Sequence, residues 1–146
     1  MKTHKQEKIT EWYSADRMHE MSKNWLSDLN FIKDEQLFLE DLITNYTQKI
    51  IDSDALDRAQ NVATALQRTK RGNQKLLTAL KRHENELQIM VDGKDELEKE
   101  NKYKAEHQEF TKTISSFYFD YKAVKFEIFE LVKQLMKTDK EEHLLK

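Results

Sequence analysis

The chain has 146 residues, no proline and only two glycines, Gly72 and Gly93. Turns depend on glycine and proline, so β-sandwiches and β-barrels, which need many turns, are disfavoured. Cysteine is also absent, which excludes disulfide scaffolds and thiolate metal sites. A chain of this length usually forms one domain. Together these features predict a single all-α domain over residues 1–146, built from a few long helices.

Signals that end a helix occur at two places. One is Asp52-Ser53-Asp54, where Ser53 or Asp54 can cap the N-terminus of the helix that follows. The other is Asp92-Gly93-Lys94-Asp95, where Gly93 can end one helix and Asp95 can cap the next. The sequence therefore predicts three long helices, over residues 6–51, 54–92 and 95–141.

Each predicted helix carries a stripe of residues at alternating spacings of three and four, which is the a and d pattern of a heptad repeat. The stripe of the first helix is Ala15, Met18, Ser22, Trp25, Leu29, Ile32, Gln36, Leu39, Ile43, Tyr46 and Ile50. That of the second is Ala59, Val62, Leu66, Thr69, Asn73, Leu76, Leu80, His83, Leu87 and Met90. That of the third is His107, Phe110, Ile114, Phe117, Tyr121, Val124, Ile128, Leu131 and Leu135. Because short connections make successive helices antiparallel neighbours, we expect an elongated antiparallel three-helix bundle with a coiled-coil core.

Large apolar residues outside these stripes indicate a second buried face on the first and third helices. They are Phe31, Phe38, Leu42, Phe119, Phe126 and Phe129. Soluble monomers rarely expose so many large apolar side chains, so we expect an oligomer interface, most simply that of a two-fold dimer with six helices. One alternative is a shifted heptad register that makes these residues core. Another is a break in the first helix near Asp34-Glu35-Gln36, which would complete a four-helix bundle within one chain.

The second predicted helix has seven basic residues and no acidic residue between Asp57 and Glu84. A basic patch on its outer face would consist of Arg68, Arg71, Lys75 and Arg82. These side chains either pair with acidic residues of neighbouring helices or bind an acidic protein, a phosphate group or nucleic acid. No aromatic residue lies between them, and the net charge of the chain is −2, so nucleic acid is the less favoured ligand.

Five histidines are the natural candidates for catalysis or metal binding. The chain has no Glu-x-x-His, no His-Glu-x-x-His and no glycine-rich phosphate loop, so we assign no catalytic, cofactor or metal site. His83 and His107 nevertheless lie on core stripes near the Gly93 turn, with His19 and Ser22 expected at the same end. We interpret them as hydrogen-bonded or partly solvated polar residues, and the alternative is a pH-sensitive or metal-binding layer.

Three other polar residues occupy stripe positions at one level of the predicted bundle: Gln36, Thr69 and Asn73. Polar residues on a heptad stripe usually fix the register and the oligomeric state, and we interpret these three in that way. The alternative is a small pocket for a polar ligand.

These features predict a non-enzymatic helical-bundle protein that acts through protein–protein interaction as a homo-oligomer, without a cofactor. A metal- or small-ligand-binding bundle that uses histidine and carboxylate side chains is the alternative, and a nucleic-acid-associated protein comes third. The segment Met1–Lys8 lacks the apolar core of a signal peptide, and no apolar run approaches the roughly 20 residues that span a bilayer. We therefore expect a cytoplasmic protein without membrane attachment.

Overall fold

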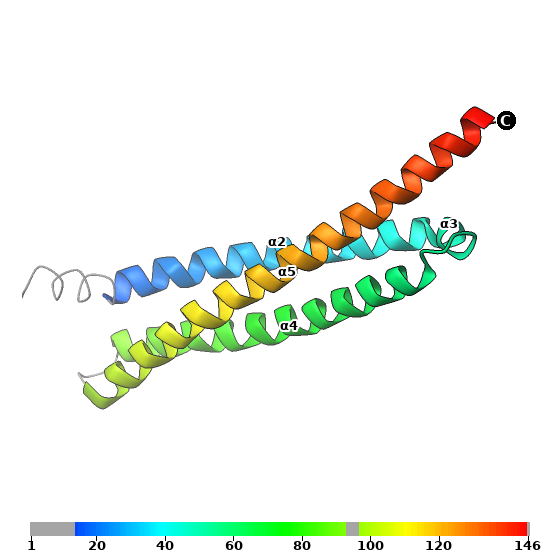
Figure 1. The fold of residues 1–146 in the computed structure, drawn as a ribbon. Helices are drawn as coiled ribbons and strands as arrows, with labels where there is room; N and C mark the ends of the chain where they lie inside the picture. Colours follow the sequence, from blue (N-terminus) through cyan, green and yellow to red (C-terminus); the bar gives the residue numbers. More distant parts are fainter. Residues whose placement is uncertain (1–13, 93–96, 146) are drawn as a thin grey trace, which may run out of the picture. The chain divides into compact units, whose positions relative to one another are not determined.

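The computed structural model describes residues 14–92 and 97–145 (Figure 1). This part of the chain contains four helices and no strand: α2 (Ala15–Asn45), α3 (Thr47–Ile51), α4 (Leu56–Asp92) and α5 (Leu97–Leu145). The prediction of an all-α fold is confirmed. The predicted helix start at residue 6 and the predicted turn around Gly93 lie outside the described residues.

The first predicted helix is not continuous, because it is divided at Tyr46 into α2 and the five-residue α3. Tyr46 has φ −99° and ψ 8°, and its N–H donates to the carbonyl of Ile43, three residues back, at 3.1 Å. Around it, the hydroxyl of Thr44 donates to the carbonyl of Glu40 at 3.0 Å, and that of Thr47 donates to the carbonyl of Thr44 at 2.7 Å. Such hydroxyls compete with backbone donors and bend or end helices. The predicted break site at Asp34-Glu35-Gln36 is therefore wrong, since α2 passes through it unbroken.

Two serine side chains form hydrogen bonds with backbone groups near the start of a helix. Ser14 caps α2, because its Oγ accepts the N–H of Arg17 at 3.2 Å. Ser53 lies between α3 and α4, where its hydroxyl donates to the carbonyl of Ile50 at 3.0 Å and accepts the N–H of Ala55 at 3.2 Å. The predicted N-cap at Ser53 or Asp54 is not observed, because α4 begins at Leu56, two residues later than predicted, and the Ser53 hydroxyl bonds within the turn that precedes it.

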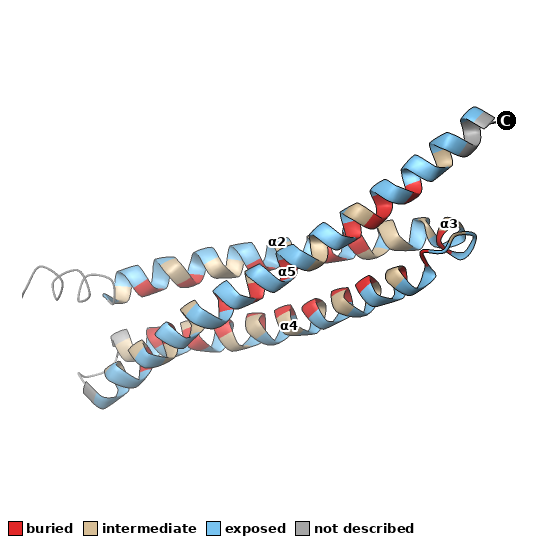
Figure 2. Cartoon of the chain, viewed as in Figure 1, coloured by how far each residue is buried: buried red, intermediate tan, exposed pale blue. Residues whose placement is uncertain are grey.

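The chain divides into two compact units, and each long helix contributes a segment to both. Unit 1 comprises the described residues up to Phe31 together with Gln74–Ser116, and unit 2 comprises Ile32–Asn73 together with the residues from Phe117 onward. In each unit, segments of α2, α4 and α5 supply most of the buried residues, which recur along one side of each helix (Figure 2). Every residue of the three predicted stripes is buried or partly buried, so the assignment of these residues to the inner side of each helix is confirmed.

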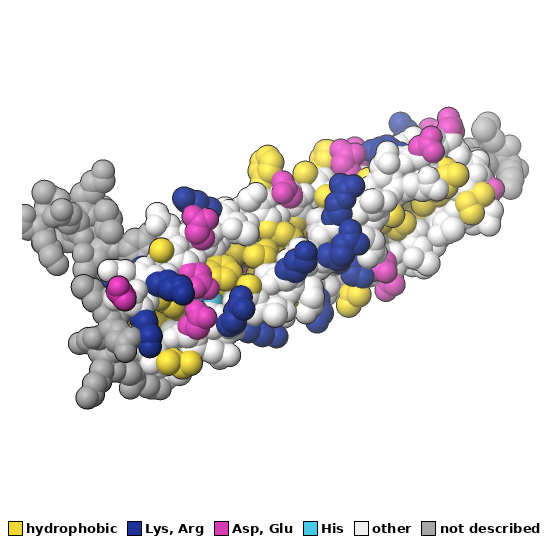
Figure 3. Space-filling view, turned by 90° about the horizontal axis from the view of Figure 1, so that it is seen from below, with side chains coloured by type: hydrophobic (Ala, Val, Ile, Leu, Met, Phe, Trp, Pro, Cys, Tyr) yellow, Lys and Arg dark blue, Asp and Glu magenta, His cyan; other side chains and the backbone are white. Residues whose placement is uncertain are grey.

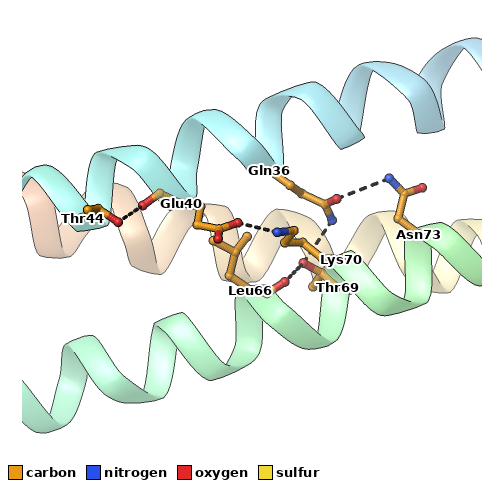
Figure 4. Close-up of polar contacts among 7 residues, drawn as sticks. All are labelled: Gln36, Glu40, Thr44, Leu66, Thr69, Lys70 and Asn73. Atoms are coloured by element: carbon orange, nitrogen blue, oxygen red, sulfur yellow. Dashed lines mark hydrogen bonds and ion pairs between the residues drawn. The ribbon is translucent and has the colours of Figure 1, made fainter.

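A polar layer interrupts the core of unit 2 (Figure 4). The amide of Gln36 donates to Thr69 Oγ1 at 3.2 Å and accepts from the amide of Asn73 at 3.4 Å. Thr69 in turn donates to the carbonyl three residues earlier at 2.7 Å, and beside this layer the ammonium of Lys70 pairs with Glu40. The three predicted residues therefore lie at one level, with α2 and α4 antiparallel here. Their mutual bonds fix the register, because a shift would bury three polar side chains without these partners.

We predict that Gly72→Ala stabilises the protein. Gly72 lies inside α4, and a Cβ at this position would lie 3.7 Å from the ring of Phe117, which is an ordinary contact. Because glycine in a helix interior costs about 0.5–1 kcal/mol relative to alanine, the free energy of unfolding in urea should rise by roughly that amount. A fall on Gly72→Ala would show that Phe117 cannot accommodate one added methyl group.

Candidate functional site

The predicted interface residues lie mostly at the surface of the chain. The exposed fractions are 66% for Phe31, 58% for Phe38, 76% for Phe119, 60% for Phe126 and 47% for Phe129. Leu42 is partly buried. The alternative that a shifted register makes the five phenylalanines core is therefore wrong. Whether they form an oligomer interface stays a prediction.

In unit 2, α5 is apolar on two faces. Its inner face carries the buried stripe, and its outer face carries exposed large apolar side chains, which we name the α5 aromatic face: Phe119, Phe126, Phe129 and Met136. Helix α2 lies beside α5 here, because the carboxylate of Glu35 accepts from Tyr121 Oη at 2.7 Å and from Lys125 Nζ at 3.1 Å. Phe38 follows Glu35 by one turn of α2 and is also exposed, whereas Phe31 belongs to unit 1.

All four residues of the predicted basic patch are exposed, with Arg68 and Arg71 in unit 2 and Lys75 and Arg82 in unit 1. None of the four makes an ion pair with another residue in the described part of the chain, whereas Lys70 and Arg58 of the same helix pair with Glu40 and Glu127. Charge matching between helices therefore accounts for Lys70 and Arg58 only. Figure 3 shows Lys and Arg side chains at the surface, with Asp, Glu and hydrophobic side chains among them. Binding of an acidic ligand stays a prediction, which salt-sensitive retention on heparin would test.

A cluster of aromatic rings encloses two buried histidines in unit 1. His83 and His107 have 0% exposure, and His83 Nε2 lies 3.1 Å from His107 Nδ1. The ring of Tyr103 stacks on that of His83, with centroids 4.0 Å apart and planes 2° apart. Phe110 packs against His83 and Trp25 against His107, each with ring centroids 4.8 Å apart. The two histidines, which were predicted from the sequence to lie on core stripes near the same turn, are thus in direct contact.

Carboxylate side chains lie beside this cluster. The two carboxylates nearest to His83 were not predicted as site residues from the sequence. His83 Nδ1 lies 3.4 Å from Glu106 Oε1, and Glu86 completes a group of three side chains that could hold a metal ion. One signal was available, since His83 and Glu86 are three residues apart and so lie on one face of a helix. His19 and Ser22 do reach this end of unit 1: His19 Nδ1 lies 2.7 Å from the carboxylate of Glu84, and Ser22 is buried.

Burial sets the protonation of the cluster. It lowers the pKa of His83 and of His107 to about 4, and the neighbouring His83 lowers that of His107 further. Burial and three nearby carboxylates, led by that of Glu84, raise the pKa of Tyr103 well above its usual value. At neutral pH the cluster therefore consists of two neutral imidazoles and a neutral phenol. Neutral imidazoles can accept hydrogen bonds or ligate metals, but they form no ion pair with the carboxylates around them.

Comparison with protein families, with curated proteins and with solved structures finds no match to this chain. Among the described helices, none has an apolar stretch long enough to cross a membrane.

We predict that the protein loses stability as the pH falls from about 6.5 to about 4, in a buffer that contains a chelator. Histidine in the unfolded chain has the ordinary pKa of 6.5, whereas His83 and His107 hold their neutral form down to about pH 4 in the folded state. In this window the unfolded state binds more protons, so the free energy of unfolding decreases with decreasing pH. Thermal unfolding at half-unit pH steps would measure the change in Tm.

The matched variant is His83→Leu/His107→Leu, which replaces both partners of the buried hydrogen bond by apolar side chains. Such a double replacement is often close to neutral in stability, whereas replacing one partner leaves the other unsatisfied. Its Tm should depend less on pH between 5 and 6.5 than the Tm of the unmodified chain. Equal slopes for the two proteins would contradict the role given to the buried histidines.

Proposed function

We propose that this chain is a non-enzymatic helical-bundle protein that acts through protein–protein interaction, and that its partner at the α5 aromatic face is a second copy of the chain. The observation that carries the proposal is the exposure of Phe119, Phe126 and Phe129 on a helix whose opposite face is already buried. A helix that is apolar on two sides is normally covered on both.

The free energy gained by burying this face is of the size expected for a protein interface. Full burial of a phenylalanine side chain contributes roughly 1.5–3 kcal/mol, so three partly exposed ones represent on the order of 5 kcal/mol before the entropy of association is subtracted. Exposed Met136 on α5 and exposed Phe38 on α2 add to the apolar area within the same unit. Exposed aromatic side chains of this kind are typical anchors of protein interfaces.

The charges around the face favour a second copy over a strongly charged partner. Asp120, Lys122, Glu127 and Lys133 are exposed on the same part of α5, two of each sign. A surface of balanced charge does not repel a copy of itself, and it offers no net charge to a strongly acidic or basic protein. A two-fold dimer, in which the same surface contributes from both copies, is the simplest assembly that covers it.

The non-enzymatic part of the proposal is supported by the histidine cluster. His83 and His107 are the buried candidates for a general base, and neither side chain reaches the surface. Their pKa values of about 4 also lie far from the range near neutral pH in which histidine transfers protons efficiently.

We predict that Phe119→Lys/Phe126→Lys converts a dimer to a monomer. Two added charges in the centre of an apolar interface would have to be desolvated on association, which costs far more than the interface contributes. Light scattering coupled to size-exclusion chromatography would measure the change, with a mass of twice 17.5 kDa expected for the unmodified chain and 17.5 kDa for the variant.

The matched control is Gln108→Lys/Thr113→Lys, which adds the same charge at exposed positions elsewhere on α5. It should remain a dimer, and all three proteins should have the same helical circular dichroism signal. A monomeric unmodified chain, or a variant that stays dimeric, would contradict the proposal. Unfolding of the Phe119→Lys/Phe126→Lys variant would also contradict the proposal, because these exposed rings would then be needed for the fold of the single chain.

A further inference from the structure

Three side chains of unit 1 bring one ring nitrogen and two carboxylates together. His83 and Glu86 share one face of α4, and Glu106 faces them from α5. The candidate ligand atoms of the three residues all lie within 4.8 Å of one another. The separation of 3.4 Å between His83 Nδ1 and Glu106 Oε1 matches the roughly 3.4 Å between two ligands of a tetrahedral zinc ion bound at 2.0–2.1 Å.

The imidazole of His83 is held in one orientation. Its ring is stacked on Tyr103 and packed against Phe110, and its Nε2 is within hydrogen-bond distance of His107 Nδ1. When Nε2 carries the proton and donates it to His107, the Nδ1 lone pair is free and directed at the side of the ring where Glu106 lies. Histidines that ligate metals typically donate their other N–H in this way, which fixes the tautomer and the ring.

The environment of His83 Nδ1 is a second, independent indication of a ligand at this position. The residue is fully buried, and this nitrogen has no hydrogen-bond partner among the residues that the structure describes, although Glu106 is only 3.4 Å away. A buried polar atom without a partner is costly, and a lone pair next to a carboxylate is satisfied by a cation placed between them.

The outer side of the group is accessible. Glu86 is exposed and the side chain of Glu106 is 35% exposed, so an ion can enter from solvent while the nitrogen ligand stays buried. Glu86 can also move its long side chain to shorten the distances of up to 4.8 Å that the group now shows.

We propose that His83, Glu86 and Glu106 bind one Zn²⁺ ion per chain, with water as the fourth ligand. Two carboxylates balance the charge of a divalent cation, and histidine nitrogen and glutamate oxygen are both ligands that zinc accepts in proteins. Mg²⁺ and Ca²⁺ prefer six or more oxygen ligands, so they fit this group poorly. The site lies within a single chain and does not depend on the dimer proposed above.

Isothermal titration of ZnCl₂ into the full chain, freed of metal by dialysis against a chelator, tests the proposal. We expect one equivalent bound per chain. Glu106→Gln and Glu86→Gln should each weaken the affinity by at least about tenfold, because each exchanges a charged ligand for a neutral amide that binds zinc poorly. Both residues are at least partly exposed, so both variants should fold, which circular dichroism would verify.

Two control variants separate this site from surface binding. Glu109→Gln removes an exposed carboxylate one turn further along α5, and His19→Gln removes the exposed histidine that contacts Glu84. Both should bind zinc as the unmodified chain does, and Mg²⁺ should give no heat of binding. Absence of zinc binding, an affinity that survives Glu106→Gln and Glu86→Gln, or a loss in either control would overturn the proposal.

Discussion

Packing between heptad stripes is the interaction on which the rest of this structure depends. The a and d positions of each helix supply most of the core of each unit, and their members Leu29, Leu80, Ile114 and Ile128 are nearly or completely buried. A polar residue at such a position is therefore buried with its apolar neighbours. In the described part of the chain, the buried polar residues all lie on these stripes: Ser22, Gln36, Thr69, Asn73, His83 and His107.

The buried polar side chains of the two units find their hydrogen-bond partners in different ways. In unit 2, Gln36 bonds to Thr69 and Asn73, so the layer is satisfied largely by its own members and serves to fix the register of α2 and α4. In unit 1, His83 and His107 satisfy one another through one nitrogen each, and the outer nitrogen of His83 lies next to carboxylates. The layer in unit 2 is thus satisfied by its own bonds, whereas the cluster in unit 1 is the place where we propose that a cation binds.

In helix α5, the heptad stripe does not determine the character of the residues on the opposite face. In unit 2 its inner stripe packs on α2 and α4, while its outer face carries three phenylalanines and a methionine. These four side chains are largely exposed in the single chain. We therefore propose an interaction beyond the chain at this face.

Local periodicity allowed much of the fold to be predicted. The three stripes were assigned from spacing alone, and each of their residues is buried or partly buried. The first helix was predicted to be continuous over residues 6–51, and the alternative of a break near Asp34-Glu35-Gln36 is wrong because α2 passes through these residues. Asp34-Glu35-Gln36 looks like a polar interruption, but Gln36 bonds to Thr69, and Glu35 bonds to Tyr121 and Lys125. Partners distant in sequence stabilise α2 there, whereas the break occurs where the hydroxyls of Thr44 and Thr47 bond to nearby carbonyls.

The amino-acid sequence by itself determined the helical class, the buried stripes and the position of both buried histidines on those stripes. These follow from spacing along a helix, which is a property of neighbouring residues. The stacking of Tyr103 on His83, the convergence of Glu86 and Glu106 and the unsatisfied nitrogen between them were decided by tertiary structure. The physical reason is that the chain has 27 acidic residues, and only the rotation of α4 against α5 selects which of them face a buried imidazole.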